Sequence, residues 1–290
     1  MKGVCYQILV QLTRMVGQWF FVAVSRIIAA GYFVFSPRTG ESHRFYATLF
    51  PDRSPLYHRW CTFIQYQNFT TIHLDRLLLT EQLDTISYTS EGLEYLGRID
   101  KNKGAIILQS HLGNWDIAAH LLQQQNSGLN MLLYMGIKDK EDVERLQKEQ
   151  LRSSGIRIIG VDRDGGSPFD AVEGINHLRS GGVVSMTGDI IWRQEQRSVE
   201  VDFLSHKARL PEAPYVFGLL SGAPILVFFT FRTGNNSYHF TLSKPIVIKA
   251  TSRDQRQNSI QQAAQQYANL LQQTLLQHPF EWYHFDRFIY

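Results

Sequence analysis

The most specific chemical pattern in this chain is His111 and Asp116, which lie five positions apart directly after the apolar segment 105–108. The apolar segment predicts a buried strand, and Gly113-Asn114 predicts a turn into a helix whose first turn contains Asp116. From that position the carboxylate can fold back toward the imidazole, orient the ring and stabilise the imidazolium. The other ring nitrogen would then take a proton from a hydroxyl. Such a pair could serve as the base half of an acyl transfer, but a histidine and an acid five residues apart also occur often by chance, so the spacing alone leaves both interpretations open.

The elements around this pair predict an α/β fold. From residue 104, short apolar runs at 105–108, 131–134, 156–161, 183–186 and 225–231 are separated by helical stretches near 114–125, 139–153, 168–180 and 212–221. Such repetition is typical of a mixed, mostly parallel sheet flanked by helices. Late or edge strands are expected at 238–242 and 246–248, followed by an amphipathic helix from about 255 to 277. Ligand and catalytic groups gather at the carboxyl edge of such sheets, where His111 follows its strand.

Composition limits the class of protein. A chain of 290 residues with 44% apolar and 19% charged residues can build one α/β domain with appended helices, and it is not disordered. The net charge of +3 comes without a dense Lys/Arg run, so nucleic acid is not an expected partner. Cys5 and Cys61 have no C-x-x-C spacing, which argues against a disulfide framework or a cysteine zinc site and indicates a reducing compartment.

The N-terminal stretch 15–35 is almost continuously apolar, but Gln18, Ser25 and Arg26 interrupt it. A charge at the centre of a membrane span costs roughly 2.5–3.5 kcal/mol, and Arg26 also makes a cleaved signal peptide an unexpected interpretation. Flanking aromatic and basic residues suit a helix lying in, or tilted through, a membrane interface. We therefore expect residues 1–36 to form a membrane-associated helix, with a buried helix of a soluble protein as the alternative.

Residues 37–290 are expected to form the catalytic domain, with a helical part at about 40–95 and an α/β core at about 100–290. Aromatic residues recur along the helical part, and they would either line a lipid-facing groove or pack inside a helical subdomain, which is the commoner use of such a stripe. They are Tyr46, Phe50, Tyr57, Trp60, Phe63, Tyr66 and Phe69.

The full string Ser110-His111-Leu112-Gly113-Asn114-Trp115-Asp116 closely resembles the signature of the lysophospholipid acyltransferase superfamily. It is most similar to the late lipid A acyltransferase branch (lauroyl/myristoyl transferase-like), whose motif is His-x-x-x-x-Asp/Glu. The resemblance covers roughly residues 40–288, and three later blocks carry it: Gly181 to Asp189, then Val201 to Pro214 with Gly222-Ala223-Pro224-Ile225, and Trp282-Tyr283 with Arg287-Phe288. The chain departs from the branch at Asp116, where Glu is usual, at Leu204-Ser205-His206 and at Ala213.

The resemblance implies a glycerol-phosphate acyltransferase-like fold and an acyltransferase on the cytoplasmic face of the inner membrane. The enzyme would pass a fatty acyl group from acyl carrier protein or acyl-coenzyme A to a hydroxyl of a membrane glycolipid, such as a lipid A precursor. His111 would be the general base and Asp116 its orienting partner, with no metal and no cofactor. Two alternatives stay open: a relative that acylates or aminoacylates another lipid, and a non-catalytic lipid-binding scaffold.

Candidate substrate-binding residues are polar groups expected near the same sheet edge: Asn114, Arg163, Asp189, Arg193, Arg209 and Glu212. Arginines grip phosphates of a headgroup or of the donor's phosphopantetheine bidentately, although solvated surface charges are the alternative. Asp189 would sit at the same edge as His111, and either hold one of these arginines or cap its turn. The oxyanion of the tetrahedral intermediate would need donors from the Gly113-Asn114 turn or from a nearby arginine or lysine.

Overall fold

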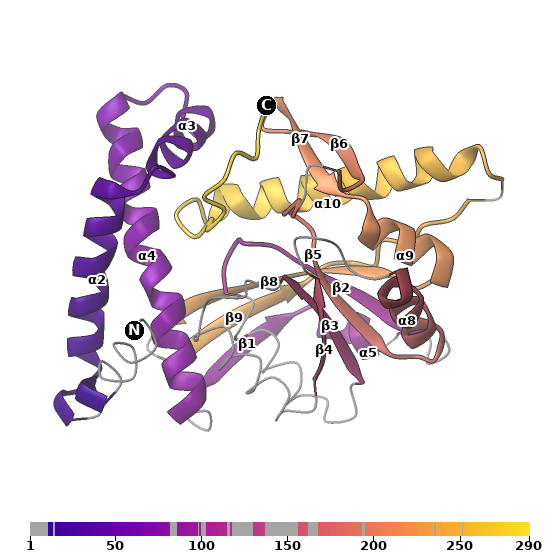
Figure 1. Ribbon diagram of the computed structural model, residues 1–290, viewed down its shortest axis with the longest axis horizontal. Coiled ribbons are helices and arrows are strands. Elements are labelled where there is room, and N and C mark those ends of the chain that lie inside the picture. Colours follow the sequence, from indigo (N-terminus) through magenta and orange to yellow (C-terminus); the bar gives the residue numbers. More distant parts are fainter. Residues whose placement is uncertain are drawn as a thin grey trace.

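The computed structural model of the chain describes residues 11–13, 15–81, 86–97, 99, 103–114, 117, 130–136, 156–161, 168–192, 195–234, 236–250 and 252–290. Within these residues a seven-stranded sheet forms the centre of the protein (Figure 1). Its strands, in spatial order, are β1 (Ser87–Glu91), β9 (Ser237–Leu242), β8 (Ile225–Gly234), β2 (Ala105–Gln109), β5 (Val183–Thr187), β3 (Met131–Gly136) and β4 (Arg157–Val161).

The sheet is mostly parallel, which confirms the predicted α/β class. Neighbours from β8 through β2, β5 and β3 to β4 all run in the same direction. β9 is antiparallel to its neighbour β8, and β1 is parallel to β9. These two strands therefore run opposite to the other five. Because β2 and β5 are parallel and Gln109 pairs with Thr187, the residues that follow these two strands meet at one edge of the sheet.

Strand β2 is buried along its whole length, as the apolar run at 105–108 predicts for a strand covered on both faces. Ile106 and Leu108 face the cluster that includes Tyr267 of the closing helix α10 (Gln255–Gln277). Ile107 points to the opposite cluster, against which the short helix α5 (Leu93–Gly97) packs. Helices α8 (Pro168–Arg179) and α9 (Ala213–Ser221) lie with α10 on the first face (Figure 1).

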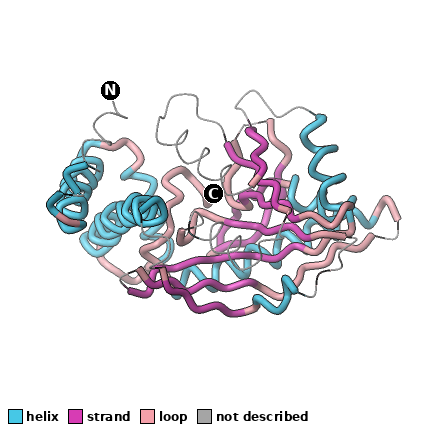
Figure 2. Tube along the Cα trace, turned by 90° about the horizontal axis from the view of Figure 1, so that it is seen from below, coloured by secondary structure: helices cyan, strands magenta, loops and turns pink. Residues whose placement is uncertain are grey.

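Three helices, α2 (Gln18–Phe35), α3 (Thr39–Leu49) and α4 (Pro55–Glu81), form a separate group beside the sheet, with α2 and α4 running side by side (Figures 1 and 2). Among the described residues, no single helix is long and apolar enough to cross a membrane. Residues 19–35 and 39–49 pass that test only together, and their helices are bent by 88° at the break between them. Membrane contact by the first helix therefore stays a prediction.

The aromatic stripe of the helical part packs against the C-terminal segment. Tyr46 is fully buried and donates its hydroxyl hydrogen to the carbonyl oxygen of Pro279 at 2.9 Å. The rings of Tyr66 and Phe69 both contact the ring of Phe285. For these aromatic residues the packed alternative is confirmed, and the stripe joins α3 and α4 to the end of the chain.

Several predicted elements differ from the structure. The expected strand at 246–248 is only an isolated bridge between Ile225 and Ile246, so that prediction is wrong. Strand β1 lies inside a stretch expected to be helical, and the hairpin of β6 (Ser198–Phe203) and β7 (His206–Pro211) was not expected. Its turn places Leu204 and Ser205 at positive φ without the glycine or asparagine that signals such turns. The expected helices at 114–125, apart from Ile117, and at 139–153 lie outside the described residues.

Candidate active site

His111 and Asp189 come together at the carboxyl edge of the sheet. His111 follows β2 by two residues and Asp189 follows β5 by two residues, and the backbone N–H of Gly188 donates to the carbonyl oxygen of Gln109 at 2.7 Å. One oxygen of the Asp189 carboxylate lies 3.0 Å from Nδ1 of His111, and the other accepts the backbone N–H of His111 at 2.6 Å. Asp189 therefore holds both the ring and the main chain of His111.

The electrostatic environment keeps this carboxylate ionised. Burial alone would raise the pKa of the fully buried Asp189, but the charge and hydrogen bonds of His111, with the nearby His284, bring that pKa below its ordinary value. An ionised carboxylate at Nδ1 fixes the ring hydrogen there and leaves the lone pair on Nε2. The His111 side chain is 26% exposed, so the ring reaches solvent. This arrangement can accept a proton and stabilise the resulting imidazolium.

The structure describes some of the predicted site residues and not others. It brings Asp189 to the side of His111, where sequence reasoning expected it at the same edge but gave it no role toward the histidine. Asp116, Arg163 and Arg193 lie outside the described residues, so their roles stay predictions. The orienting contact that the spacing predicted for Asp116 has a described counterpart in Asp189.

Asn114 is buried and ties the loop of residues 111–114, hereafter the catalytic loop, to helix α4. Its amide nitrogen donates to one carboxylate oxygen of Asp75 at 2.7 Å. The other oxygen of Asp75 accepts the hydroxyl hydrogen of Tyr238 at 2.6 Å and pairs with Arg232 at 3.3 Å. Asp75 is 1% exposed, so these charged contacts are shielded from water and set the loop's position. Sequence reasoning gave Asp75 no role, although Asp75-Arg76 lies within the stretch that resembles the family.

The backbone of the catalytic loop cannot form the oxyanion hole that was expected from the Gly113-Asn114 turn. All four backbone N–H groups of residues 111–114 donate within the protein. That of Gly113 goes to the carbonyl oxygen of Glu281 at 3.0 Å, and that of Asn114 to the carbonyl oxygen of Thr230 at 2.8 Å. An oxyanion needs donors that are not already engaged. The expectation is therefore wrong for these two N–H groups, and an arginine or lysine donor stays a prediction.

Gly113 is required where it is. Its φ is +79°, and an added Cβ atom would lie 2.2 Å from the carbonyl oxygen of Thr230. Only a residue without a side chain allows both this conformation and this close approach to β8. The glycine of the motif therefore seats the catalytic loop directly on its neighbouring strand.

The C-terminal segment 281–288 completes the site from the far end of the chain. Trp282 forms an antiparallel bridge with Leu112, and the backbone N–H of Tyr283 donates to the carbonyl oxygen of His111 at 2.7 Å. The ring of His284 lies 6.0 Å from the ring of His111, with the two planes at 84°. Sequence reasoning noted Trp282 and Tyr283 but missed His284, although a histidine inside a resembling block is a usable signal.

Two other predicted substrate-binding residues lie on the β6–β7 hairpin and at the start of α9. Arg209 is exposed on the outer face of the hairpin, with its guanidinium 5.8 Å from the centre of the Tyr290 ring. Glu212 directly precedes α9. Among the described residues, neither side chain makes an ion pair or hydrogen bond with His111 or Asp189. Their substrate-binding roles stay predictions.

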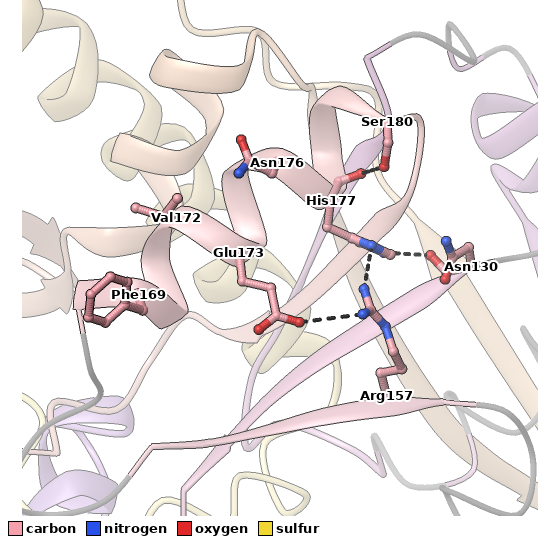
Figure 3. Close-up of a pocket in the computed structure, with 8 residues that line it drawn as sticks. All are labelled: Asn130, Arg157, Phe169, Val172, Glu173, Asn176, His177 and Ser180. Atoms are coloured by element: carbon pink, nitrogen blue, oxygen red, sulfur yellow. Dashed lines mark hydrogen bonds and ion pairs between the residues drawn. The ribbon is translucent and has the colours of Figure 1, made fainter.

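A surface hollow of about 750 Å³ lies at the amino edge of the sheet, where the parallel strands begin, opposite the carboxyl edge that holds His111. Its lining includes Asn130, which precedes β3, Arg157, which begins β4, and His177 near the end of α8 (Figure 3). Strands of five or six residues separate this edge from that of His111, which corresponds to roughly 16–20 Å. The hollow is therefore not part of the candidate active site.

Comparison with known proteins finds acyltransferases among the relatives of this chain. The phosphatidylinositol mannoside acyltransferase of Mycobacterium tuberculosis (strain ATCC 25618 / H37Rv) is 27% identical over 158 residues, which cover 51% of this chain and 44% of that protein. The protein of the same description from strain CDC 1551 / Oshkosh matches with the same identity and coverage. The chain thus matches less than half the length of these curated relatives.

The family match covers more of the chain than these relatives do. Residues 68–288 match the family described as bacterial lipid A biosynthesis acyltransferase. This range includes helix α4 from residue 68, all seven strands of the sheet, and the C-terminal segment that contacts His111. The branch suggested by the motif at 110–116 is thereby confirmed. The chain belongs to the bacterial lipid A biosynthesis acyltransferase family.

Proposed function

We propose that this protein transfers a fatty acyl group from acyl carrier protein or acyl-coenzyme A to a hydroxyl of a membrane glycolipid, such as a lipid A precursor. The observation that carries the proposal is the contact between His111 and Asp189 at the carboxyl edge of the sheet. Family membership supports the reaction type. The name of the mycobacterial relatives supports a glycolipid as acceptor.

In the proposed reaction, Nε2 of His111 removes the proton from the acceptor hydroxyl as its oxygen attacks the thioester carbonyl. The carboxylate of Asp189, 3.0 Å from Nδ1, stabilises the imidazolium that forms. Collapse of the tetrahedral intermediate breaks the carbon–sulfur bond, and the leaving thiolate takes the proton from His111. The products are the ester and the free thiol, so the histidine returns to its neutral form. Asp116 is proposed as a second carboxylate that serves the same base.

The protein is proposed to work at the cytoplasmic face of the inner membrane, with α2 as the contacting helix. Trp19, Ile27, Tyr32 and Phe35 on this helix are each at least 60% exposed. Large apolar side chains gathered on one exposed helix are unfavourable in water and favourable at a lipid interface. Arg26 on the same helix is also exposed and suits contact with anionic headgroups.

The test is to express the protein in a bacterial strain with a defined lipid A and to weigh all extracted lipids by mass spectrometry. We expect lipid A to gain the mass of one fatty acyl group, and the His111→Ala variant to give no such gain. A gain on another glycolipid, with lipid A unchanged, would replace the acceptor and favour the sugar-headed class that the mycobacterial relatives suggest. No acylated product on any lipid would contradict the proposal and favour a scaffold.

A further inference from the structure

His284 is a second histidine in the candidate active site, beside His111. Its ring stacks on Trp282, with centroids 5.5 Å apart and planes at 14°, and it meets the ring of Phe288 at 5.2 Å. Packed against these aromatic rings, His284 is only 8% exposed. On the remaining side the ring lies 6.0 Å from that of His111. The ring is therefore rigidly held beside the general base.

The hydrogen bond of His284 defines which ring nitrogen carries a hydrogen. Nδ1 lies 3.1 Å from the backbone carbonyl oxygen of Asp286. A carbonyl oxygen can only accept, so the hydrogen is on Nδ1 and the lone pair is on Nε2. Burial lowers the pKa of His284, with the charge of Asp189 opposing it, so the ring is neutral near pH 7. No described residue donates to Nε2, which is thus a hydrogen-bond acceptor on a ring whose centre lies 6.0 Å from that of His111.

We propose that His284 is a specificity-determining residue, whose Nε2 accepts a hydrogen bond from a second hydroxyl of the acceptor headgroup while His111 activates the first. The inference rests on the proposed function and narrows its acceptor to a polyhydroxylated headgroup. Neighbouring hydroxyls of one sugar ring can reach two imidazoles at this spacing with ordinary hydrogen-bond lengths. An acceptor with a single hydroxyl would leave Nε2 of a mostly buried His284 without a donor, which is unfavourable.

The test measures kcat/KM for transfer of a dodecanoyl group, from both coenzyme A and acyl carrier protein, to dodecyl β-D-glucopyranoside and its four monodeoxy analogues. For the wild type, kcat/KM should be about tenfold lower with the analogue that lacks the hydroxyl next to the acylated one than with the parent glucoside. The His284→Phe variant keeps a ring for stacking on Trp282 but removes the acceptor nitrogen. For this variant, kcat/KM with the parent glucoside should fall by the same factor, and kcat/KM with that analogue should be no lower than with the parent. His284→Gln, which retains an acceptor oxygen, should restore part of the discrimination.

His206→Phe is the matched control, since His206 is exposed at the start of β7 and no ring contact or hydrogen bond joins it to His111 or His284 among the described residues. It should keep the wild-type pattern over all five acceptors. If His284→Phe lowers kcat/KM by the same factor for all five acceptors, His284 has only a structural role and the inference is overturned. If the wild type transfers to the glucosides without discriminating among them, the inference is also overturned while the proposed function stands. If the wild type acylates a cellular lipid but none of these glucosides, the inference is overturned while the proposed function stands. If it acylates neither, both are overturned.

Discussion

Two histidines at opposite edges of the same sheet show how partners decide what a histidine can do. His111 has a carboxylate at Nδ1, 3.0 Å from Asp189, and its side chain reaches solvent. His177 is 5% exposed; its Nδ1 lies 2.9 Å from the guanidinium of Arg157 and its Nε2 lies 2.9 Å from the carbonyl oxygen of Asn130 (Figure 3). The guanidinium only donates and the carbonyl only accepts, so both nitrogens of His177 are committed and its ring is held neutral.

The difference teaches that a hollow does not by itself identify an active site. The hollow around His177 holds an ion pair between Arg157 and Glu173 at 3.4 Å. Burial of the ring and the guanidinium of Arg157 at Nδ1 oppose protonation of the histidine, and together they outweigh the carbonyl oxygen of Asn130, which favours it. A general base needs the reverse, a neighbour that favours the charged ring. The His111 edge supplies a carboxylate in direct contact with the ring, that of Asp189 at 3.0 Å from Nδ1. The chemistry of the contacts therefore outweighs the size of the opening.

The largest expected effect separates the two histidines. His111→Ala should lower kcat/KM by about 10²–10⁴-fold, because the proton of the acceptor hydroxyl loses its base. His177→Gln should leave kcat/KM within a few-fold and cost about 1 kcal/mol of folding stability, since an amide can keep part of both hydrogen bonds. Acyl transfer assays and urea unfolding measure the two effects. A folded His177→Gln protein that lost activity as fully as His111→Ala would break the comparison.

The second prediction compares the two acids assigned to His111. Asp189→Asn should lower kcat/KM by about 10²-fold or more, because an amide at 3.0 Å from Nδ1 neither stabilises the imidazolium nor fixes the ring hydrogen. The Asp116→Asn variant should lose less if Asp189 is the main orienting group. Both variants are assayed from pH 6 to 9 on the same acceptor. A larger loss for Asp116→Asn would return the orienting role to Asp116, as the five-residue spacing first suggested.

The sequence reveals one partner of His111 better than the other for a physical reason. Asp116 is five residues away and belongs to a local motif, whereas Asp189 reaches His111 only because β2 and β5 are parallel neighbours. The strands themselves were predictable, since a fully buried strand such as β2 reads as an apolar run. The pairing order β8-β2-β5-β3 was not, because any of several parallel strands could have been the neighbour of β2.

Other misses have the same origin. His284 and Asp75 contact the catalytic loop across long separations in sequence, and neither contact follows from a local pattern. The loop's backbone N–H groups looked available as oxyanion donors because their acceptors, the carbonyls of Glu281 and Thr230, belong to distant segments. Local chemistry was thus predictable, while the contacts that position it depend on tertiary packing.

The third prediction compares two glycines with nearly the same positive φ. Gly113 has φ +79° and would place a Cβ 2.2 Å from the carbonyl oxygen of Thr230, whereas Gly222 has φ +74° with nothing within 4 Å. Gly222→Ala should cost about 1–2 kcal/mol, the conformational penalty alone. Gly113→Ala should cost about 3 kcal/mol or more and also lower activity, since the loop must move away from β8. Equal losses in urea unfolding would show that the close approach to Thr230 has no energetic effect.

The smallest effect follows from pH, and its sign separates the two regions again. Burial, opposed by the hydrogen bond to Asn130, lowers the pKa of His177 below 6.5, so the unfolded chain binds this proton first as pH falls. The contribution of His177 to the unfolding free energy should therefore be constant above about pH 7 and decrease as pH drops below 6.5. The lowered pKa of Asp189 acts in the other window: its contribution is complete above the ordinary value of 3.8 and is lost only as pH falls through the lower folded pKa.

Urea unfolding from pH 5 to 8 measures the contribution of the histidines to the unfolding free energy, because Asp189 stays ionised throughout that range. The buried His284 also has a lowered pKa and adds to the same decrease, so His177→Gln should flatten the curve only in part. His206→Phe, at an exposed position, should leave the slope unchanged. If wild type and His177→Gln have the same slope, His177 is not held neutral by its two partners. The contrast with His111 would then rest on Asp189 alone.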